Sequence, residues 1–129
     1  MNTDTSVEKL NLTSSVIIGT AQAVSNALEC GFLEKVYENS LTIELRRRGH
    51  AVRQQFPVQV RYRSEIVGEY VADLLVDECV IVELKAMPIT GNIHRAQCLN
   101  YLRATGLRLS LLLNFRRPRL EVHRVVSSL

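Results

Sequence analysis

The chain has 129 residues, the length of one compact domain, and its 47% hydrophobic and 22% charged residues form the composition of an ordinary globular protein. These values exclude a multidomain enzyme and a disordered chain, while a net charge of +3 permits a polyanionic partner without demanding one. No apolar run approaches the roughly 20 residues of a membrane-spanning helix and no signal-peptide pattern opens the chain, so we expect a cytoplasmic protein without membrane contact.

Two helices are predicted in the first part of the chain. Apolar residues recur at spacings of three and four from Leu12 to Leu28, behind a Thr13–Ser15 cluster able to cap a helix, and residues 1–12 are expected to be a flexible segment. A second helix follows Gly31 and ends before Gly49. Its apolar stripe comprises Leu33, Tyr37, Leu41 and Leu45.

The remaining sequence predicts strands with one further helix. After Pro57, residues typical of strands fill Val58–Arg63, Ile66–Val76 and Cys79–Lys85. The helical period returns from Asn92 to Ala104 and is closed by Gly106. An apolar run of strand length, Leu107–Phe115, and a more exposed strand, Leu120–Val126, complete the chain.

This order of elements predicts an α/β fold in a single domain, residues 1–129. The first three strands should form an antiparallel meander, and a crossover helix should join the third strand to a parallel neighbour. The result is a mixed β-sheet flanked by helices. The three cysteines, Cys30, Cys79 and Cys98, lack CxxC spacing and are interpreted as small buried hydrophobes.

Three charged residues interrupt otherwise apolar strands: Asp73, Glu83 and Lys85. With a two-residue loop at Asp77-Glu78, Asp73 would pair with Val82 and face away from Glu83. With a three-residue connection, or a one-residue bulge, Asp73 lies opposite Glu83. The second register also forms one apolar face, consisting of Ala72, Leu74, Val76, Val80, Val82 and Leu84, so the hydrophobic pattern favours it.

Two carboxylates held side by side repel each other, so one must take up a proton or a cation must lie between them. Mg²⁺ or Mn²⁺ suits such hard oxygen ligands, and Mg²⁺ usually takes only one or two carboxylates. Lys85 would then lie close to a metal-bound water, which it can help to activate. An equally weighted alternative from these residues alone is a structural ion pair between Lys85 and a carboxylate.

Asp73 followed by Glu83-Leu84-Lys85 resembles the D…ExK core of the PD-(D/E)XK nuclease superfamily, and the chain is similar to its small GxxExxY proteins. The similarity covers nearly everything from Thr13 to Val126. One departure is Ala72, where a proline often precedes the aspartate. The blocks that carry the resemblance are Gly31–Tyr37, Gly68–Val76, Ile81–Ala86, His94–Leu107 and Leu112–Phe115.

The resemblance implies a restriction-endonuclease-like core and a role for each matching residue. Asp73 and Glu83, with the backbone carbonyl of Leu84, would bind Mg²⁺ or Mn²⁺, and Lys85 would activate the attacking water. Glu34 on the second helix would complete the metal site or support it. The alternative for Glu34 is a solvated residue favoured by the helix dipole, and Glu38 is the competing candidate for its role.

Further residues are candidates for contact with nucleic acid. Gln97 and Tyr101 lie four residues apart on the crossover helix and resemble a QxxxY pair of recombination-type exonucleases, while His94 beside Arg95 is placed to reach a phosphate. For His94, a surface role without catalysis is the competing interpretation. A second basic cluster, Arg46, Arg47 and Arg48, suits a duplex backbone or simply a solvated helix end.

The hypothesis from sequence is a metal-dependent nuclease that hydrolyses phosphodiester bonds, with DNA as the expected substrate. With no tryptophan and 5% aromatic residues, an extended base-stacking platform for single strands is not expected. The small size favours a homodimer, by analogy with junction resolvases of similar size and fold. The alternatives are a catalytically silent binding module for nucleic acid or protein on the same fold, and a structural protein with an ion-pair network.

Overall fold

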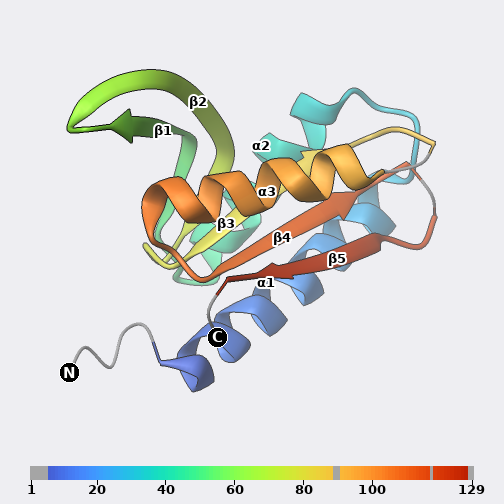
Figure 1. The fold of residues 1–129 in the computed structure, drawn as a ribbon. Coiled ribbons are helices and arrows are strands. Elements are labelled where there is room, and N and C mark those ends of the chain that lie inside the picture. Colours follow the sequence, from blue (N-terminus) through green and yellow to red (C-terminus); the bar gives the residue numbers. More distant parts are fainter. Residues whose placement is uncertain (1–5, 89–90, 117, 128–129) are drawn as a thin grey trace.

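In the computed structural model, which describes residues 6–88, 91–116 and 118–127, a five-stranded sheet in the order β1-β2-β3-β4-β5 forms the centre of the molecule (Figure 1). The pair β3–β4 is parallel and the other neighbouring pairs are antiparallel, which confirms the predicted meander and crossover. In chain order the elements are α1 (Val7–Leu28), α2 (Glu34–Arg47), β1 (Val52–Tyr62), β2 (Glu65–Val76), β3 (Val80–Lys85), α3 (Asn92–Thr105), β4 (Leu109–Asn114) and β5 (Glu121–Val126).

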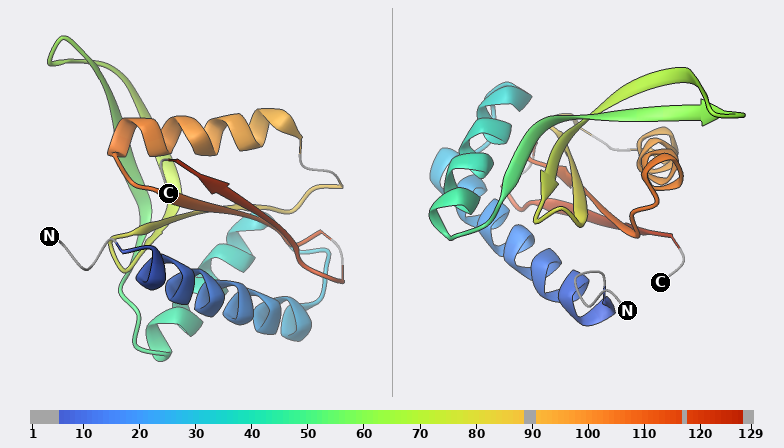
Figure 2. Two further views of the ribbon diagram at one scale, coloured as in Figure 1. Left: turned by 60° about the horizontal axis from the view of Figure 1, so that its bottom comes forward. Right: turned by 90° about the vertical axis from the view of Figure 1, so that its left-hand side faces the viewer.

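Helices cover both faces of the sheet. Figure 2 shows α1 and α2 on one face and α3 on the other. The larger apolar core lies under α1 and α2 and contains Ile17, Leu41 and Leu111, whereas a smaller one lies under α3 and contains Leu75 and Leu102. Each face of the sheet is therefore buried, which explains why β3 and β4 are apolar along nearly their whole length.

The register between β2 and β3 is the one that the hydrophobic pattern favours. Leu74 pairs with Val82 and Val76 pairs with Val80, so the connection has three residues. Asp77 and Glu78 both adopt positive φ, and the Asp77 carboxylate accepts a hydrogen bond from the amide of Ala51 at 2.9 Å, which anchors this turn. The pairing places Asp73 next to Glu83.

One residue of the predicted apolar face belongs elsewhere. Ala72 is fully buried, but in the smaller core with Val58 and Tyr101, because β2 bends away from β3 beyond Leu74. The other five members, Leu74, Val76, Val80, Val82 and Leu84, lie in the larger core as expected.

The first helix begins at Val7, five residues before the predicted start. Its cap is Ser6, whose hydroxyl accepts a hydrogen bond from the amide of Lys9 at 3.1 Å, and the predicted capping residues Thr13 and Ser14 are instead buried within the helix. Leu10 is 1% exposed in the larger core. The expected flexible segment 1–12 is therefore wrong for residues 7–12, and residues 1–5 lie outside the described residues.

Three smaller expectations also fail. Leu33 is 81% exposed because it precedes the first turn of α2 in an extended conformation, so the buried stripe starts at Tyr37. Strand β1 starts at Val52, before Pro57, and tolerates the proline because it is an edge strand. Cys30 is exposed, whereas the other two cysteines are buried as predicted.

Strands β1 and β2 extend beyond the rest of the sheet as a two-stranded hairpin (Figure 2). We call residues 58–70 the hairpin arm; its strands pair from Val58 with Tyr70 to Tyr62 with Glu65. The regular pairing of β3 with β2 ends at Leu74, so the arm stands on the side of α3 without support from β3.

We predict that Leu10→Ala destabilises the protein by about 2–5 kcal/mol, the usual effect of emptying a buried leucine site. Leu12→Ala is the matched control, because Leu12 is 63% exposed in the same helical turn and its loss should change stability by no more than about 0.5 kcal/mol. Urea denaturation measures both. Equal effects of the two substitutions would show that residues 7–12 do not pack as described.

Candidate active site

The carboxylates of Asp73 and Glu83 bind each other's strand. Glu83 Oε1 accepts a hydrogen bond from the backbone amide of Asp73 at 2.8 Å, and Asp73 Oδ2 accepts one from the amide of Leu84 at 2.8 Å. These two bonds replace the backbone ladder at the point where β2 and β3 separate. Both side chains are thereby held next to each other, each with only one of its two oxygens used by these bonds.

Burial makes this pair costly as two negative charges. Burial first and the negative charge of Asp73 second raise the pKa of Glu83 to about 8, against the opposing effects of the Asp73 amide and of Lys85. Burial likewise raises the pKa of Asp73, although the hydrogen bond from Leu84 lowers it. The pair therefore favours holding either a proton or a cation.

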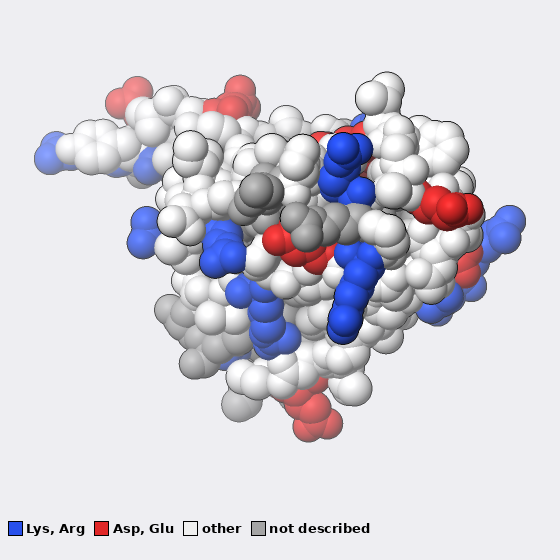
Figure 3. All heavy atoms as spheres, turned by 90° about the vertical axis from the view of Figure 1, so that its right-hand side faces the viewer, with Lys and Arg blue, Asp and Glu red and all other residues white. Residues whose placement is uncertain are grey.

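Glu34 and Lys85 complete the charged cluster. Glu34 is half-buried in the first turn of α2, and its pKa is raised by burial, lowered by the Lys85 charge and raised by Asp73, so it lies within electrostatic reach of both. Acidic side chains, with basic ones around them, gather on the face of the molecule where β3 ends and α3 begins (Figure 3). The four predicted residues Glu34, Asp73, Glu83 and Lys85 thus come from three elements to one place.

The donor set fits a divalent ion bound by two carboxylates. Asp73 and Glu83 supply hard oxygens, and partly water-coordinated Mg²⁺ needs no more carboxylates than these. Among the described residues, no group of three or more His, Cys, Asp or Glu side chains is close enough to hold an ion. In this geometry Glu34 is therefore near the pair without being gathered into a three-ligand site.

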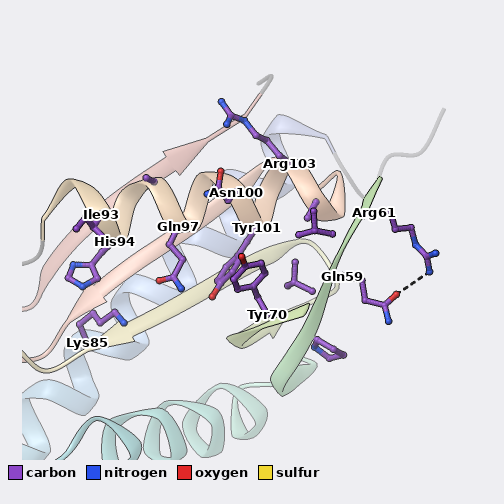
Figure 4. A pocket seen from close by; sticks show the side chains of 15 residues that line it. Gln59, Arg61, Tyr70, Lys85, Ile93, His94, Gln97, Asn100, Tyr101 and Arg103 are labelled. Carbon is purple, nitrogen blue, oxygen red and sulfur yellow. Dashed lines mark hydrogen bonds between the residues drawn. The ribbon is translucent and has the colours of Figure 1, made fainter. Parts of the chain in front are cut away.

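Gln97 and Tyr101 share a groove with Lys85. The groove has a volume of about 1390 Å³ and lies between α3 and the hairpin arm, and the side chains of both residues point from α3 toward the strands (Figure 4). Burial, together with the charges of Glu83 and Asp73, raises the pKa of Tyr101 to about 12. The helical spacing therefore places both residues in the groove that Lys85 lines, and Tyr101 lies within electrostatic reach of the carboxylates.

A family model described as the PD-(D/E)XK nuclease superfamily matches residues 11–125. The chain belongs to this superfamily. No curated protein and no solved structure matches it. The mixed sheet with one parallel pair, flanked by helices, is the restriction-endonuclease-like fold of these proteins, which generally hydrolyse phosphodiester bonds and typically use divalent metal ions. No helix among the described residues is long and apolar enough to cross a membrane.

The other predicted nucleic-acid contacts do not gather at the carboxylates of this PD-(D/E)XK protein. Arg46, Arg47 and Arg48 lie at the far end of α2 from Glu34, about 18 Å along the helix at 1.5 Å per residue. There Arg46 donates to the carbonyl of Val52 at 2.8 Å and Arg48 donates to the hydroxyl of Thr20 at 3.0 Å. Both side chains therefore have a structural function.

His94 and Arg95 diverge at the start of α3. His94 lines the groove and its Nδ1 accepts a hydrogen bond from the amide of Gly91 at 3.2 Å, so it also caps the helix. Arg95 instead contacts Nδ1 of His123 on β5 at 2.9 Å. Only His94 of this pair faces the groove.

Sequence reasoning missed Gln55, which connects α2 to the carboxylates of this superfamily member. Its Nε2 donates to both carboxylate oxygens of buried Glu38, at 3.0 and 3.1 Å, and a hydrogen bond from Gln55 also lowers the pKa of Asp73. Its φ of 53° interrupts the pairing of β1 at this residue. The local sequence does not predict this role, because a glutamine on an edge strand is usually a solvent-exposed polar residue and matches no known motif.

Asn114 is a second residue without a predicted role. It pairs with Lys85 across the parallel strands, is 1% exposed, and binds the backbone of Met87 twice: it donates to the carbonyl at 2.8 Å and accepts from the amide at 3.2 Å. The chain leaving Lys85 is therefore held by β4. Asn114 lies within the Leu112–Phe115 block of the resemblance, which is the signal that marks it.

We predict that stability without metal falls as pH rises between about 4.5 and 8. In that window the folded protein keeps a proton on Glu83 that the unfolded chain releases. The stabilisation that this proton provides is therefore complete below pH 4.5 and is lost as the pH rises through 8. The slope for one proton reaches at most about 1.4 kcal/mol per pH unit.

Glu83→Gln should flatten this dependence, because glutamine does not titrate and can still accept from the Asp73 amide. Urea unfolding at several pH values in EDTA measures it, with the exposed Glu65→Gln as a control that keeps the original profile. Parallel profiles for wild type and Glu83→Gln would contradict the assignment of the shifted proton to this residue.

Proposed function

We propose that the protein is a metal-dependent nuclease that hydrolyses phosphodiester bonds of nucleic acid, with DNA as its substrate. The observation that carries this proposal is the juxtaposition of Asp73 and Glu83, each fixed to the neighbouring strand, beside Lys85 at the end of an open groove. A purely structural ion pair would not need two mutually repelling carboxylates, both with raised pKa values.

The roles of the residues follow from their positions. Asp73 and Glu83, with the carbonyl of Leu84, would hold Mg²⁺ or Mn²⁺, and Glu34 supports the site from α2. A divalent ion bound there supplies positive charge that promotes ionisation of water and offsets charge developing on phosphate. Lys85 orients the attacking water and offsets negative charge on the phosphate, while Gln97 and Tyr101 position the strand.

Within the superfamily, we place the chain among the small GxxExxY proteins on the segment Gly31–Tyr37. This segment includes Glu34, and its Tyr37 is 1% exposed with the hydroxyl donating to the carbonyl of Glu29 at 2.5 Å. The motif thus combines a residue near the carboxylates with one that fixes the start of α2. We expect a homodimer, which sedimentation of the purified chain measures directly.

We predict that Mg²⁺ raises the melting temperature of the wild type at constant ionic strength, because a ligand that binds only the folded state stabilises it by mass action. Asp73→Asn should abolish the rise, since it removes one of two charged ligands, whereas exposed Glu65→Gln should retain it. A melting temperature insensitive to Mg²⁺ and Mn²⁺ in the wild type would favour a structural ion network over a metal site.

We predict that the purified protein cleaves DNA in Mg²⁺ or Mn²⁺ and that Lys85→Ala lowers the rate at least about 10²-fold, the scale of losing a group that assists proton transfer. Labelled single-stranded, duplex and branched substrates measure the rate. Lys9→Ala is the matched control, because it removes a lysine from the first turn of α1, and Figure 1 shows that end of α1 far from the end of β3, where Lys85 lies.

Two outcomes of the cleavage and melting measurements would contradict the proposed nuclease activity. Equal cleavage by wild type and Lys85→Ala would point to a contaminant or to another site. Metal-dependent stabilisation without any cleavage would favour the alternative, a catalytically silent module that binds nucleic acid or protein on the same fold.

A further inference from the structure

The groove between α3 and the hairpin arm extends well beyond the residues needed for hydrolysis. On α3 its lining runs along one face from Ile93 to Ala104, and on the arm it includes Val58, Val60 and Tyr70. Lys85 lines the same groove, so the groove leads to the carboxylate cluster (Figure 4). A ligand lying along it would pass directly over Gln97 and Tyr101 before it reaches Lys85.

The walls of the groove offer apolar and amide groups in addition to the cations that bind phosphates. The lining combines apolar side chains and two tyrosines with the side-chain amides of Gln97 and Asn100 and with three cations, Arg61, Lys85 and Arg103, and none of the described residues that line it is acidic. The outer surface of a duplex presents mainly phosphates, which bind to cations and backbone amides. Apolar and amide groups instead suit the faces and edges of unpaired bases.

Two tyrosines meet in the groove although they are distant in sequence. The rings of Tyr70 and Tyr101 have centroids 6.2 Å apart, and Tyr70 is 51% exposed on the arm. Base stacking on an aromatic side chain contributes about 1–3 kcal/mol per base to the binding of single strands, beside the attraction of cations for the phosphates. The low aromatic content of the chain therefore still allows a short stacking site, because the fold brings two of its tyrosines together.

The length of the groove suits a short run of nucleotides. The part of α3 from Ile93 to Ala104 is about 16 Å long at 1.5 Å per residue, the length of about five stacked nucleotides at 3.4 Å each.

We infer that the groove between α3 and the hairpin arm binds unpaired nucleotides of the strand to be cleaved, with Tyr70 as a base-stacking residue. The inference rests on the proposed nuclease function and adds to it the substrate class, a single-stranded polynucleotide or a single-stranded segment. Tyr70 binds the strand away from the reacting phosphate, so it determines strand affinity rather than the chemical step.

The test measures binding in EDTA, where metal-dependent cleavage cannot occur. Fluorescence anisotropy follows a labelled 12-nucleotide oligodeoxynucleotide, an oligoribonucleotide of the same sequence, and the corresponding DNA duplex. We expect the wild type to bind one of the single strands at least about tenfold more tightly than the duplex, and the preferred sugar distinguishes DNA from RNA.

Two pairs of variants locate the binding site. Tyr70→Ala should weaken single-strand binding at least about fivefold, the lower end of the effect of losing one base-stacking side chain. Its control is Tyr62→Ala, because Tyr62 is a 63% exposed tyrosine of the same arm outside the groove. Ile93→Glu should also weaken binding by placing a negative charge in the groove, whereas Val67→Glu adds the same charge to the arm outside it.

All four side chains are half-exposed or more, so each variant should fold, and circular dichroism verifies this. The inference is overturned if neither single strand binds, if the duplex binds as tightly as the single strands, or if Tyr70→Ala and Ile93→Glu bind like the wild type. Groove-dependent binding without Lys85-dependent cleavage would overturn the nuclease alone. Lys85-dependent cleavage unaffected by either groove variant would overturn the groove alone.

Discussion

Asp73 and Glu83 are neighbours because each carboxylate replaces a backbone partner on the opposite strand. The two hydrogen bonds, from the amides of Asp73 and Leu84, satisfy donors that the separation of β2 and β3 would otherwise leave unpaired. They also hold two buried acids side by side: burial raises the pKa of both, and the charge of Asp73 adds to the rise at Glu83. The two contacts that satisfy the backbone where β2 and β3 separate therefore also create a pair of acids that is stabilised by binding a proton or a cation.

The surrounding structure maintains this arrangement from several directions. Asn114 on β4 holds the chain just after Lys85, and Gln55 on β1 links Asp73 to Glu38 on α2. Glu34 approaches from the first turn of α2. The carboxylate pair thus depends on strands on both sides of β2 and β3, which explains why a site of so few residues needs the complete mixed sheet.

Much of this could be predicted from the sequence. The period of two in the strands selected the register of β2 and β3, because a shift by one residue would have exposed the apolar face, and this register brought Asp73 to Glu83. The helical spacing of Gln97 and Tyr101 placed both in one groove. The start of α1 was missed because only one apolar residue that packs in the core, Leu10, precedes the predicted start.

What the sequence did not reveal depends on tertiary contacts. Gln55 is identified by its positive φ and by its hydrogen bonds to Glu38 on α2, and the residues next to it in the sequence predict neither of these features. Tyr70 and Tyr101 are 31 positions apart and approach only because the arm leans toward α3. Overall composition therefore gave no sign of this tyrosine pair, since it counts aromatic residues without their positions.

The independence of the hairpin arm from β3 has a consequence for how such a domain can diversify. Beyond Leu74, β2 pairs with β1 alone, so the arm can gain or lose residues at its tip without disturbing either apolar core. Two extra residues on each strand would lengthen it by about 7 Å, at 3.4 Å per residue. A change in the length of the arm can therefore change the extent of the groove that the arm borders, while the carboxylates at its base keep their positions.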